Sequence, residues 1–409
     1  MKTATKILSL VMTAFFFTDC IVEEENELTT SSSSSSSITA TSIASGSTFS
    51  ANNALYIDLD NEKVSVDNTD WASLSDTETS LFSETVTVTK ASATSLIKID
   101  AQEITENLAI YFTGTQTSGG VKIQTSTDHE VGVYLDNISI TSTNYPCIDI
   151  TKGGAATVFL TGENTLKDGR NYSSDYSSSG SDNKGTLFCK GGISLCGDGS
   201  LTITQNYKSC IASKGNISIE NGTYTLTSTA VAVYDSSESD YNSPALINCD
   251  GNITIKGGSV SGTASGKGSK AITVDGTYTQ SDGMVNVKAT GSKISSGSAS
   301  ASAKGVKVDG AINVSGGKLY ASSASHEAIE SKSTITITGG EVYGYSEADD
   351  GINAASDFTI SGGYVCGYAP KNDGLDANGN LYIKGGVVYA VGSCRKRRRW
   401  PCRHRPAAG

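Results

Sequence analysis

Acidic residues in the C-terminal third of the chain recur at a constant spacing of 23 residues. Carboxylate and amide oxygens are the ligands that calcium prefers, at about 2.3–2.6 Å. If residues one spacing apart are neighbours in space, their carboxylates can share a cation, and the sequence predicts one or two calcium sites. A solvated Asp-Gly turn is the alternative. The first series, with Asp349 beside it, is Glu327, Asp350 and Asp373, and the second series is Glu330, Asn353 and Asp376.

Tyrosines recur with the same spacing. Because side chains alternate along a strand, these tyrosines point outward if the apolar residues between them point inward. Exposed phenol rings suit contact with sugar rings and hydrogen bonds to their hydroxyls. The alternative is a purely structural role, in which tyrosines cover the outer surface of the strands because this residue type is favoured in strands. One series is Tyr320, Tyr343 and Tyr389, and the other is Tyr345 and Tyr368.

Lys304 lies one spacing before Glu327. A calcium-assisted lyase needs a base that takes the proton α to a uronate carboxyl, and a lysine beside the metal can act in this way. An ion pair with Glu327 is the alternative role. The chain has no Walker, Rossmann or Gly-x-Ser-x-Gly element. We assign Lys304 to substrate binding. Because no catalytic motif is recognised, we assign no catalytic residue.

These residues sit on a repeated pattern of two alternating apolar residues, a Gly-Gly or Asn-Gly turn, and a second alternating pair. Examples are ITITGGEVYG from Ile335 and FTISGGYVCG from Phe358. Alternation over a few residues predicts short strands with one buried face. The fixed period and the absence of helical heptads predict an all-β fold, a right-handed parallel β-helix. Residues 46–393 have room for roughly 15 coils of 23 residues.

Several strings between Val86 and Ser393 resemble the bacterial carbohydrate-binding β-helix family known as the cellulose- and pectin-binding Cthe-type domain. The strings are VGVYLDNISIT, ATVFLTGENTLKDG, SLTITQNYKSCIASKGNISIENGTYTLT and the DDGINA and NDGLDA coils. The resemblance implies a pectate-lyase-like shape, an extracellular location, bound calcium, and binding of plant polysaccharides without established cleavage. The family's usual HGI…KD and DGI coils are altered here to SCIASKG, KAITVDG and KGVKVDG.

The ends of the chain differ in composition from the repeats. Lys2 and Lys6 flank the start of a short apolar run that ends close to Cys20. This pattern predicts a lipoprotein-like signal peptide with Cys20 as the lipidation site. The predicted segments are a signal peptide over 1–20, a Ser-rich linker over 21–45, the carbohydrate-binding β-helix over 46–393 and a basic, atypical tail over 394–409.

The chain has 409 residues and a formal net charge of −11. An acidic surface repels nucleic acid, so we expect no nucleic-acid partner, and we expect membrane contact only through the lipid anchor. The resulting hypothesis is a calcium-dependent, non-catalytic protein that binds cellulose-like or pectin-like polysaccharide at the bacterial cell surface, as an outer-membrane lipoprotein or a secreted protein. The alternatives are a calcium-dependent polygalacturonate lyase and an adhesin or structural β-solenoid.

Overall fold

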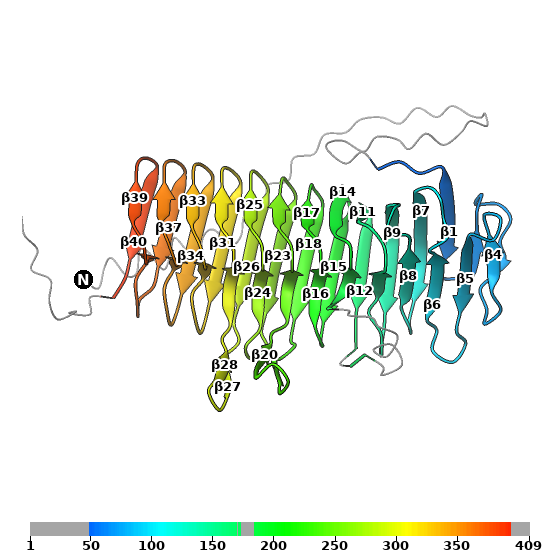
Figure 1. Cartoon of the computed structure of the whole chain (residues 1–409), viewed down its shortest axis with the longest axis horizontal. Helices are drawn as coiled ribbons and strands as arrows, with labels where there is room; N and C mark the ends of the chain where they lie inside the picture. Colours follow the sequence, from blue (N-terminus) through cyan, green and yellow to red (C-terminus); the bar gives the residue numbers. More distant parts are fainter. Residues whose placement is uncertain (1–48, 170, 173–183, 394–409) are drawn as a thin grey trace, which may run out of the picture. The chain divides into compact units, whose positions relative to one another are not determined.

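The computed structural model describes residues 49–169, 171–172 and 184–393. These residues form an all-β structure in which short strands stack coil upon coil (Figure 1). None of them forms a helix that is long and apolar enough to cross a membrane. The predicted signal peptide with Cys20, the Ser-rich linker and the basic tail lie outside the described residues.

Each regular coil contributes three strands, and strands of successive coils pair in parallel along three faces. The first face contains β1 (Asn53–Asp58), β7 (Leu108–Gln116), β9 (Val131–Thr141), β11 (Ala156–Thr161), β14 (Ile193–Gly197), β17 (Ile217–Ile219), β22 (Ile253–Ile255), β25 (Tyr278–Gln280), β30 (Ile312–Val314), β33 (Ile335–Ile337), β36 (Phe358–Ile360) and β39 (Leu381–Ile383).

The second face begins in the C-terminal parts of β7 and β9, which are long enough to run through both faces. It continues through β12 (Glu163–Lys167), β15 (Ser200–Gln205), β18 (Thr223–Ser228), β23 (Ser259–Ala264), β26 (Met284–Ala289), β31 (Lys318–Ser323), β34 (Glu341–Ser346), β37 (Tyr364–Tyr368) and β40 (Val387–Val391).

The third face is a sheet of 13 strands, in which β4 (Thr79–Leu81) and β5 (Val86–Lys90) are antiparallel and the other eleven are parallel. The parallel strands are β6 (Ile97–Ala101), β8 (Val121–Thr125), β10 (Ile148–Thr151), β13 (Gly185–Cys189), β16 (Ser209–Ser213), β21 (Ala245–Cys249), β24 (Lys270–Val274), β29 (Lys304–Val308), β32 (Ile329–Ser331), β35 (Ile352–Ala354) and β38 (Leu375–Ala377).

The parallel β-helix is therefore confirmed, but the expected number of coils is wrong. In the described residues, twelve strands stack on the first face and eleven parallel strands on the third, fewer than the expected 15 or so coils, because part of the chain does not follow the 23-residue period. At the N-terminal end, the strands β2 (Lys63–Ser65) and β3 (Ala72–Ser73) extend the sheet of β1 in antiparallel fashion, and β4 and β5 extend the third face in the same way, so that they form an N-terminal cap. Two hairpins, β19 (Val233–Asp235) with β20 (Asp240–Asn242) and β27 (Ile294–Ser296) with β28 (Ala299–Ala301), project from the coils (Figure 1).

The repeated glycines fix the stacking of the last coils. Gly317, Gly340, Gly363 and Gly386 have φ angles between +68° and +82°. A Cβ atom on Gly363 would lie 2.7 Å from the carbonyl carbon of Gly339 in the preceding coil. Glycine is the residue that adopts a positive φ and permits this approach without strain. Neighbouring coils therefore pack backbone against backbone at the turn between the first and second faces.

The interior consists of apolar residues stacked in register. Ile335 pairs with Ile312 in the preceding coil and with Phe358 in the next, and all three are buried. Removal of apolar surface from water contributes about 25 cal/mol per Å². Since each coil buries its inner residues only when its neighbours are present, the stack forms one continuous core.

Candidate functional site

Acidic side chains of three successive coils meet at the corner where the chain passes from the second face to the third. Two buried serines fix the backbone of this corner. Ser323 Oγ accepts a hydrogen bond from the backbone N–H of His326 at 3.1 Å, and Ser346 Oγ accepts one from the backbone N–H of Asp349 at 2.9 Å. Residues 23 apart are thus held in the same turn conformation. We call the following group the acidic corner: His326, Glu327, Asp349, Asp350, Asn372 and Asp373.

Glu327 is a buried carboxylate that is already paired. Its Oε2 atom lies 3.0 Å from Lys304 Nζ and is in contact with His326 Nδ1. Burial by itself would raise the pKa of Glu327, but the hydrogen bond from His326 and the charge of Lys304 outweigh it and lower this pKa to about 2. Glu327 is consequently ionised at all physiological pH values.

His326 links two coils of the acidic corner. Its Nδ1 atom contacts Glu327 and lies 3.1 Å from Asp349 Oδ2, while Asn372 donates to Asp349 Oδ1 at 2.7 Å. One ligand atom from each of His326, Glu327 and Asp349 lies within 4.8 Å of the others. From the sequence we expect His326 to be only a polar surface residue, and its position directly before Glu327 was the available signal of a role in the corner.

Asp350 is the second buried carboxylate of the corner. It accepts the N–H of Asp373 at 3.1 Å and the side-chain amide of Asn353 at 3.3 Å. Burial raises the pKa of Asp350 to about 6, and the charges of Asp349, Asp376 and Asp373 add to the increase. Ionised Asp350 therefore has an unfavourable electrostatic environment, which a bound cation would relieve.

The second predicted series follows one row of the third face. Glu330, Asn353 and Asp376 are in register on β32, β35 and β38. Glu330 is buried and contacts the ammonium groups of both Lys304 and Lys332. Two lysines therefore compensate the charge of Glu330, which makes it a weaker metal-ligand candidate than the members of the acidic corner.

Lys304 is held by the two carboxylates it contacts. Its side chain is 12% exposed and pairs with Glu327 and Glu330. Lys270, its register neighbour on β24, differs in its environment. Burial lowers the pKa of Lys270 to about 8, and the positive charges of Lys307 and Lys304 act in the same direction. Lys270, which the sequence analysis did not consider, is the better candidate for a lysine that can be neutral.

The predicted tyrosines lie on the outer side of the second face. Tyr320 and Tyr343 make an edge-to-face contact at 4.7 Å, and Tyr345 and Tyr368 stack at 5.5 Å between ring centroids. Tyr364 is a further member of this group. It was missed because it does not share an offset with the others, although it lies on the same side of β37 as Cys366, two residues away.

Tyr364 closes the gap that Cys366 leaves between Tyr343 and Tyr389. Its ring centroid lies 5.4 Å from that of Tyr343 and 5.5 Å from that of Tyr389. The rings of this series partly cover one another, and the Tyr320 hydroxyl donates to Glu341 Oε2 at 2.6 Å. The arrangement suits hydrogen bonding to hydroxyl-rich ligands along several coils.

Comparison with known proteins places the chain in a family. The sequence model of carbohydrate-binding domain-containing proteins matches residues 100–238 and 233–350, which is more than half of the chain. No curated protein matches. A solved structure described as the polysaccharide lyase-like protein from C. thermocellum, gadolinium derivative, is 17% identical, with a TM-score of 0.40, and the match covers 83% of this chain and 99% of that one. On the strength of the family match, the chain belongs to the family of carbohydrate-binding domain-containing proteins.

Proposed function

We propose that the chain is a non-catalytic polysaccharide-binding protein of the bacterial cell surface that uses calcium at the acidic corner. The observation that carries the proposal is the convergence of carboxylates from three successive coils on one corner. A glycan that lies along the coil axis would meet this corner and the neighbouring tyrosines Tyr345 and Tyr368 together. Its cellulose-like or pectin-like identity follows from the resemblance of the sequence.

The acidic corner fits a divalent cation by its donor set. Glu327, Asp349 and Asp350 provide carboxylate oxygens, which calcium prefers, and the backbone spacing of adjacent strands is about 4.8 Å. His326 provides a nitrogen within reach of two of these carboxylates. Bound calcium would supply positive charge between the chain and an acidic glycan, and the protein residues would fix its position.

A bridging cation would also reduce the electrostatic repulsion between the protein and an acidic glycan. The chain carries a net charge of −11, and a uronate-rich glycan is negatively charged as well. Like charges raise the free energy of association unless counter-charge is present. The proposed location at the cell surface rests on the predicted lipidation of Cys20.

The test is a calorimetric titration of the full chain with calcium, followed by glycan-array binding with and without EDTA. Asp350→Ala and Asp373→Ala should each weaken calcium binding about tenfold or more, and EDTA should remove glycan binding. Asp282→Ala is the control, because Asp282 is an exposed acidic residue that hydrogen-bonds the following amide outside the corner. Unchanged calcium affinity in both corner variants would refute this site. Glycan binding that EDTA leaves intact would refute the calcium dependence.

Lyase activity is a second candidate function, and Lys270 is the observation that favours it. A lysine with a pKa of about 8 is partly neutral under mildly alkaline conditions and can accept a proton. The test is the ultraviolet absorbance of unsaturated uronate products with polygalacturonate and calcium at pH about 8.5. Activity that Lys270→Met abolishes would support a lyase. No absorbance change in the unsubstituted chain would leave binding as the function.

A further inference from the structure

His326 gives the acidic corner a ligand that calcium does not favour. Calcium takes oxygen ligands, whereas imidazole beside carboxylates is a ligand set of zinc and other divalent transition metals. One ligand atom from each of His326, Glu327 and Asp349 lies within 4.8 Å of the other two. Across the part of the chain that the structure describes, no other histidine, cysteine and carboxylate side chains form a group of three this close together. We call His326, Glu327 and Asp349 the mixed triad.

The ligand atoms of the mixed triad meet between two successive coils. His326 Nδ1 contacts Glu327 Oε2 and lies 3.1 Å from Asp349 Oδ2. Zinc bonds of about 2.0–2.2 Å in a tetrahedral site place neighbouring ligand atoms about 3.3–3.6 Å apart, so small shifts would complete such a site. A neutral imidazole has a single N–H, so Nδ1 can donate at most one hydrogen to the two oxygens that face it. A metal ion would use a lone pair of all three atoms.

Hydrogen bonds around the mixed triad orient its ligands. The buried hydroxyls of Ser323 and Ser346 accept the backbone N–H groups of His326 and Asp349. Asn372 donates to Asp349 Oδ1 at 2.7 Å, which leaves Oδ2 directed toward His326. Outer hydrogen bonds of this kind fix metal ligands before the ion binds, and their loss typically lowers metal affinity about 10–100-fold.

A metal ion can reach the mixed triad from solvent. The side chains of His326 and Asp349 are each 31% exposed, and that of Glu327 is 8% exposed. Lys304 Nζ, which lies 3.0 Å from Glu327 Oε2, opposes a cation, but it is shared with Glu330. Carboxylates outnumber ammonium groups here by five to two, so the local charge attracts a cation. The carboxylates are those of Glu327, Glu330, Asp349, Asp350 and Asp373, and the ammonium groups are those of Lys304 and Lys332.

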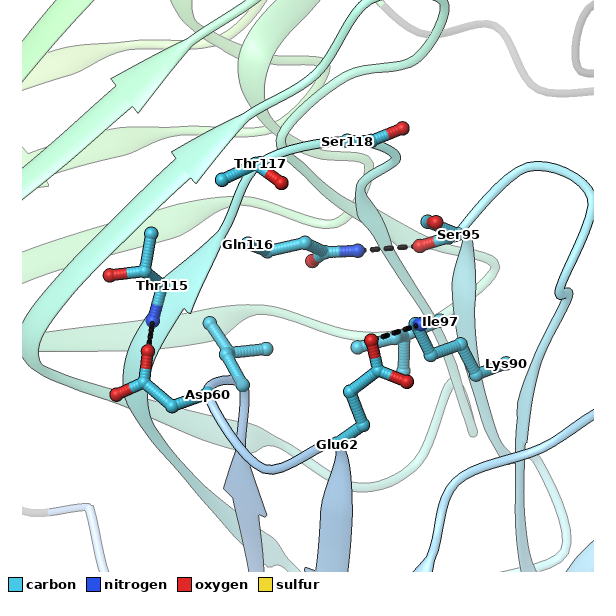
Figure 2. Close-up of a pocket in the computed structure, with 10 residues that line it drawn as sticks. Asp60, Glu62, Lys90, Ser95, Ile97, Thr115, Gln116, Thr117 and Ser118 are labelled. Atoms are coloured by element: carbon cyan, nitrogen blue, oxygen red, sulfur yellow. Dashed lines mark hydrogen bonds and ion pairs between the residues drawn. The ribbon is translucent and has the colours of Figure 1, made fainter.

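The cavity at the N-terminal end of the β-helix lacks such a preference. It has a volume of about 210 Å³, and Figure 2 shows most of the residues that line it. Lys90 Nζ lies 2.8 Å from Glu62 Oε1, and Asp60 accepts the N–H of Thr115 at 3.0 Å. Because these charged groups are engaged with the protein itself, the mixed triad is the stronger candidate for a further ligand.

We propose that the mixed triad binds a divalent transition metal, with zinc as the probe, in preference to calcium. Imidazole suits zinc, copper and nickel ions, whereas calcium takes about six to eight oxygen ligands. The ion would join the coils that carry Glu327 and Asp349, and water would complete its coordination on the exposed side. Zinc binding here is independent of the proposed calcium binding, which is tested at Asp350 and Asp373, outside the mixed triad.

The test is a calorimetric titration with zinc, in excess calcium, of the full chain after metal removal with EDTA and desalting. The tail contains other zinc ligands, Cys394 and Cys402, so the titrated chain carries Cys394→Ser/Cys402→Ser and should still bind zinc. Adding His326→Gln should lower zinc affinity about tenfold or more. It should lower calcium affinity less, because an amide oxygen suits calcium better than zinc. His129→Gln is the matched control and should retain zinc binding, because His129 is another partly exposed histidine but lies outside the mixed triad.

A second variant keeps the proposal testable if His326→Gln does not fold. Asp349→Asn removes one carboxylate of the mixed triad and should also lower zinc affinity about tenfold. Absence of zinc binding by the Cys394→Ser/Cys402→Ser chain overturns the proposal, and so does full zinc affinity in folded His326→Gln or Asp349→Asn.

The two metals are distinguished by Asp350→Ala, which should weaken calcium binding but keep zinc affinity within about threefold. Zinc binding without calcium binding would refute only the proposed use of calcium. Calcium binding without zinc binding would refute only the proposed metal at the mixed triad.

Discussion

Lys304 Nζ lies 3.0 Å from Glu327 Oε2, although the two residues belong to successive coils. Their contact follows from the parallel register of β29 and β32, in which Val306 pairs with Ile329. The same lysine also contacts Glu330. One ammonium group thus compensates two buried carboxylates at the edge of the acidic corner, and a cation in the corner would have Lys304 as its nearest positive neighbour in the preceding coil.

Lys304→Met should destabilise the fold by about 3 kcal/mol, because it removes the ammonium group that pairs with two buried carboxylates and leaves Glu330 with Lys332 alone. The side chains of Glu327 and Glu330 are 8% and 3% exposed, so water compensates little of the loss. Urea unfolding, followed by circular dichroism, measures the change. The double variant Lys304→Met/Glu327→Gln should recover part of this loss, since one of the two carboxylate charges that Lys304 compensated is then absent. Equal stability of Lys304→Met and the unsubstituted chain would contradict the ion-pair assignment.

Asp168 should make stability fall as the pH rises. Burial raises its pKa to about 6, while hydrogen bonds from Asn206, Tyr172 and Thr186 limit the increase. The folded state therefore holds a proton that the unfolded state releases near its ordinary pKa of 3.8. The stabilisation is fully present below pH 3.8 and is lost as the pH rises through about 6, and it amounts to roughly 3 kcal/mol at most.

The measurement is the free energy of unfolding at pH about 4.5 and about 7. Asp168→Asn cannot ionise, so its stability should change less between these two pH values than that of the unsubstituted chain. The effect of Glu327, whose pKa is lowered from 4.5 to about 2, has the opposite sign and develops mainly below pH 4.5. If the Asp168→Asn variant retains the full pH dependence of stability, that dependence arises from another group.

Gly363→Ala should destabilise the coil stack by more than the conformational cost of a left-handed residue, which is about 1–2 kcal/mol. Gly363 has a φ of +79°, and a Cβ atom would lie 2.6 Å from the Gly340 carbonyl oxygen. Gly297→Ala is the control, since Gly297 also has a positive φ of +58° but nothing lies within 4 Å of its Cβ position. Thermal unfolding compares the two. A larger loss at Gly297 would contradict close backbone packing between coils.

Tyr364→Ala should weaken glycan binding about threefold to tenfold and change stability little. Its ring lies between those of Tyr343 and Tyr389 and thus interrupts the series of hydroxyl groups when it is removed. The control is Tyr382→Ala, because Tyr382 is an exposed tyrosine on β39 of the first face, outside the tyrosine series. Affinity electrophoresis in the polysaccharide that the glycan array identifies gives the comparison. Equal retardation of the two variants would exclude the tyrosine series from the binding surface.

The repeat in the sequence was sufficient to predict the fold class and its register in the last coils. The period of 23 residues is visible in the spacing of Gly317, Gly340, Gly363 and Gly386. The apolar residues of the alternating pairs before and after these glycines are buried, as expected. Pairing of residues 23 apart then follows, because parallel strands of equal coils align residue by residue. The predicted acidic residues are neighbours for the same reason.

The tertiary structure alone decided how many coils form and which side chains meet at a corner. Insertions change the coil length without leaving a periodic signal, and alternation along strands says nothing about directions in the turns between them. His326 therefore lies beside Glu327 and Asp349, and Tyr364 takes the position in the tyrosine series that Cys366 leaves open. Gln116 pairs in register with Ile140, in a row of otherwise isoleucine and leucine residues. Each of these contacts depends on which residues of different coils face each other, a property that local sequence does not contain.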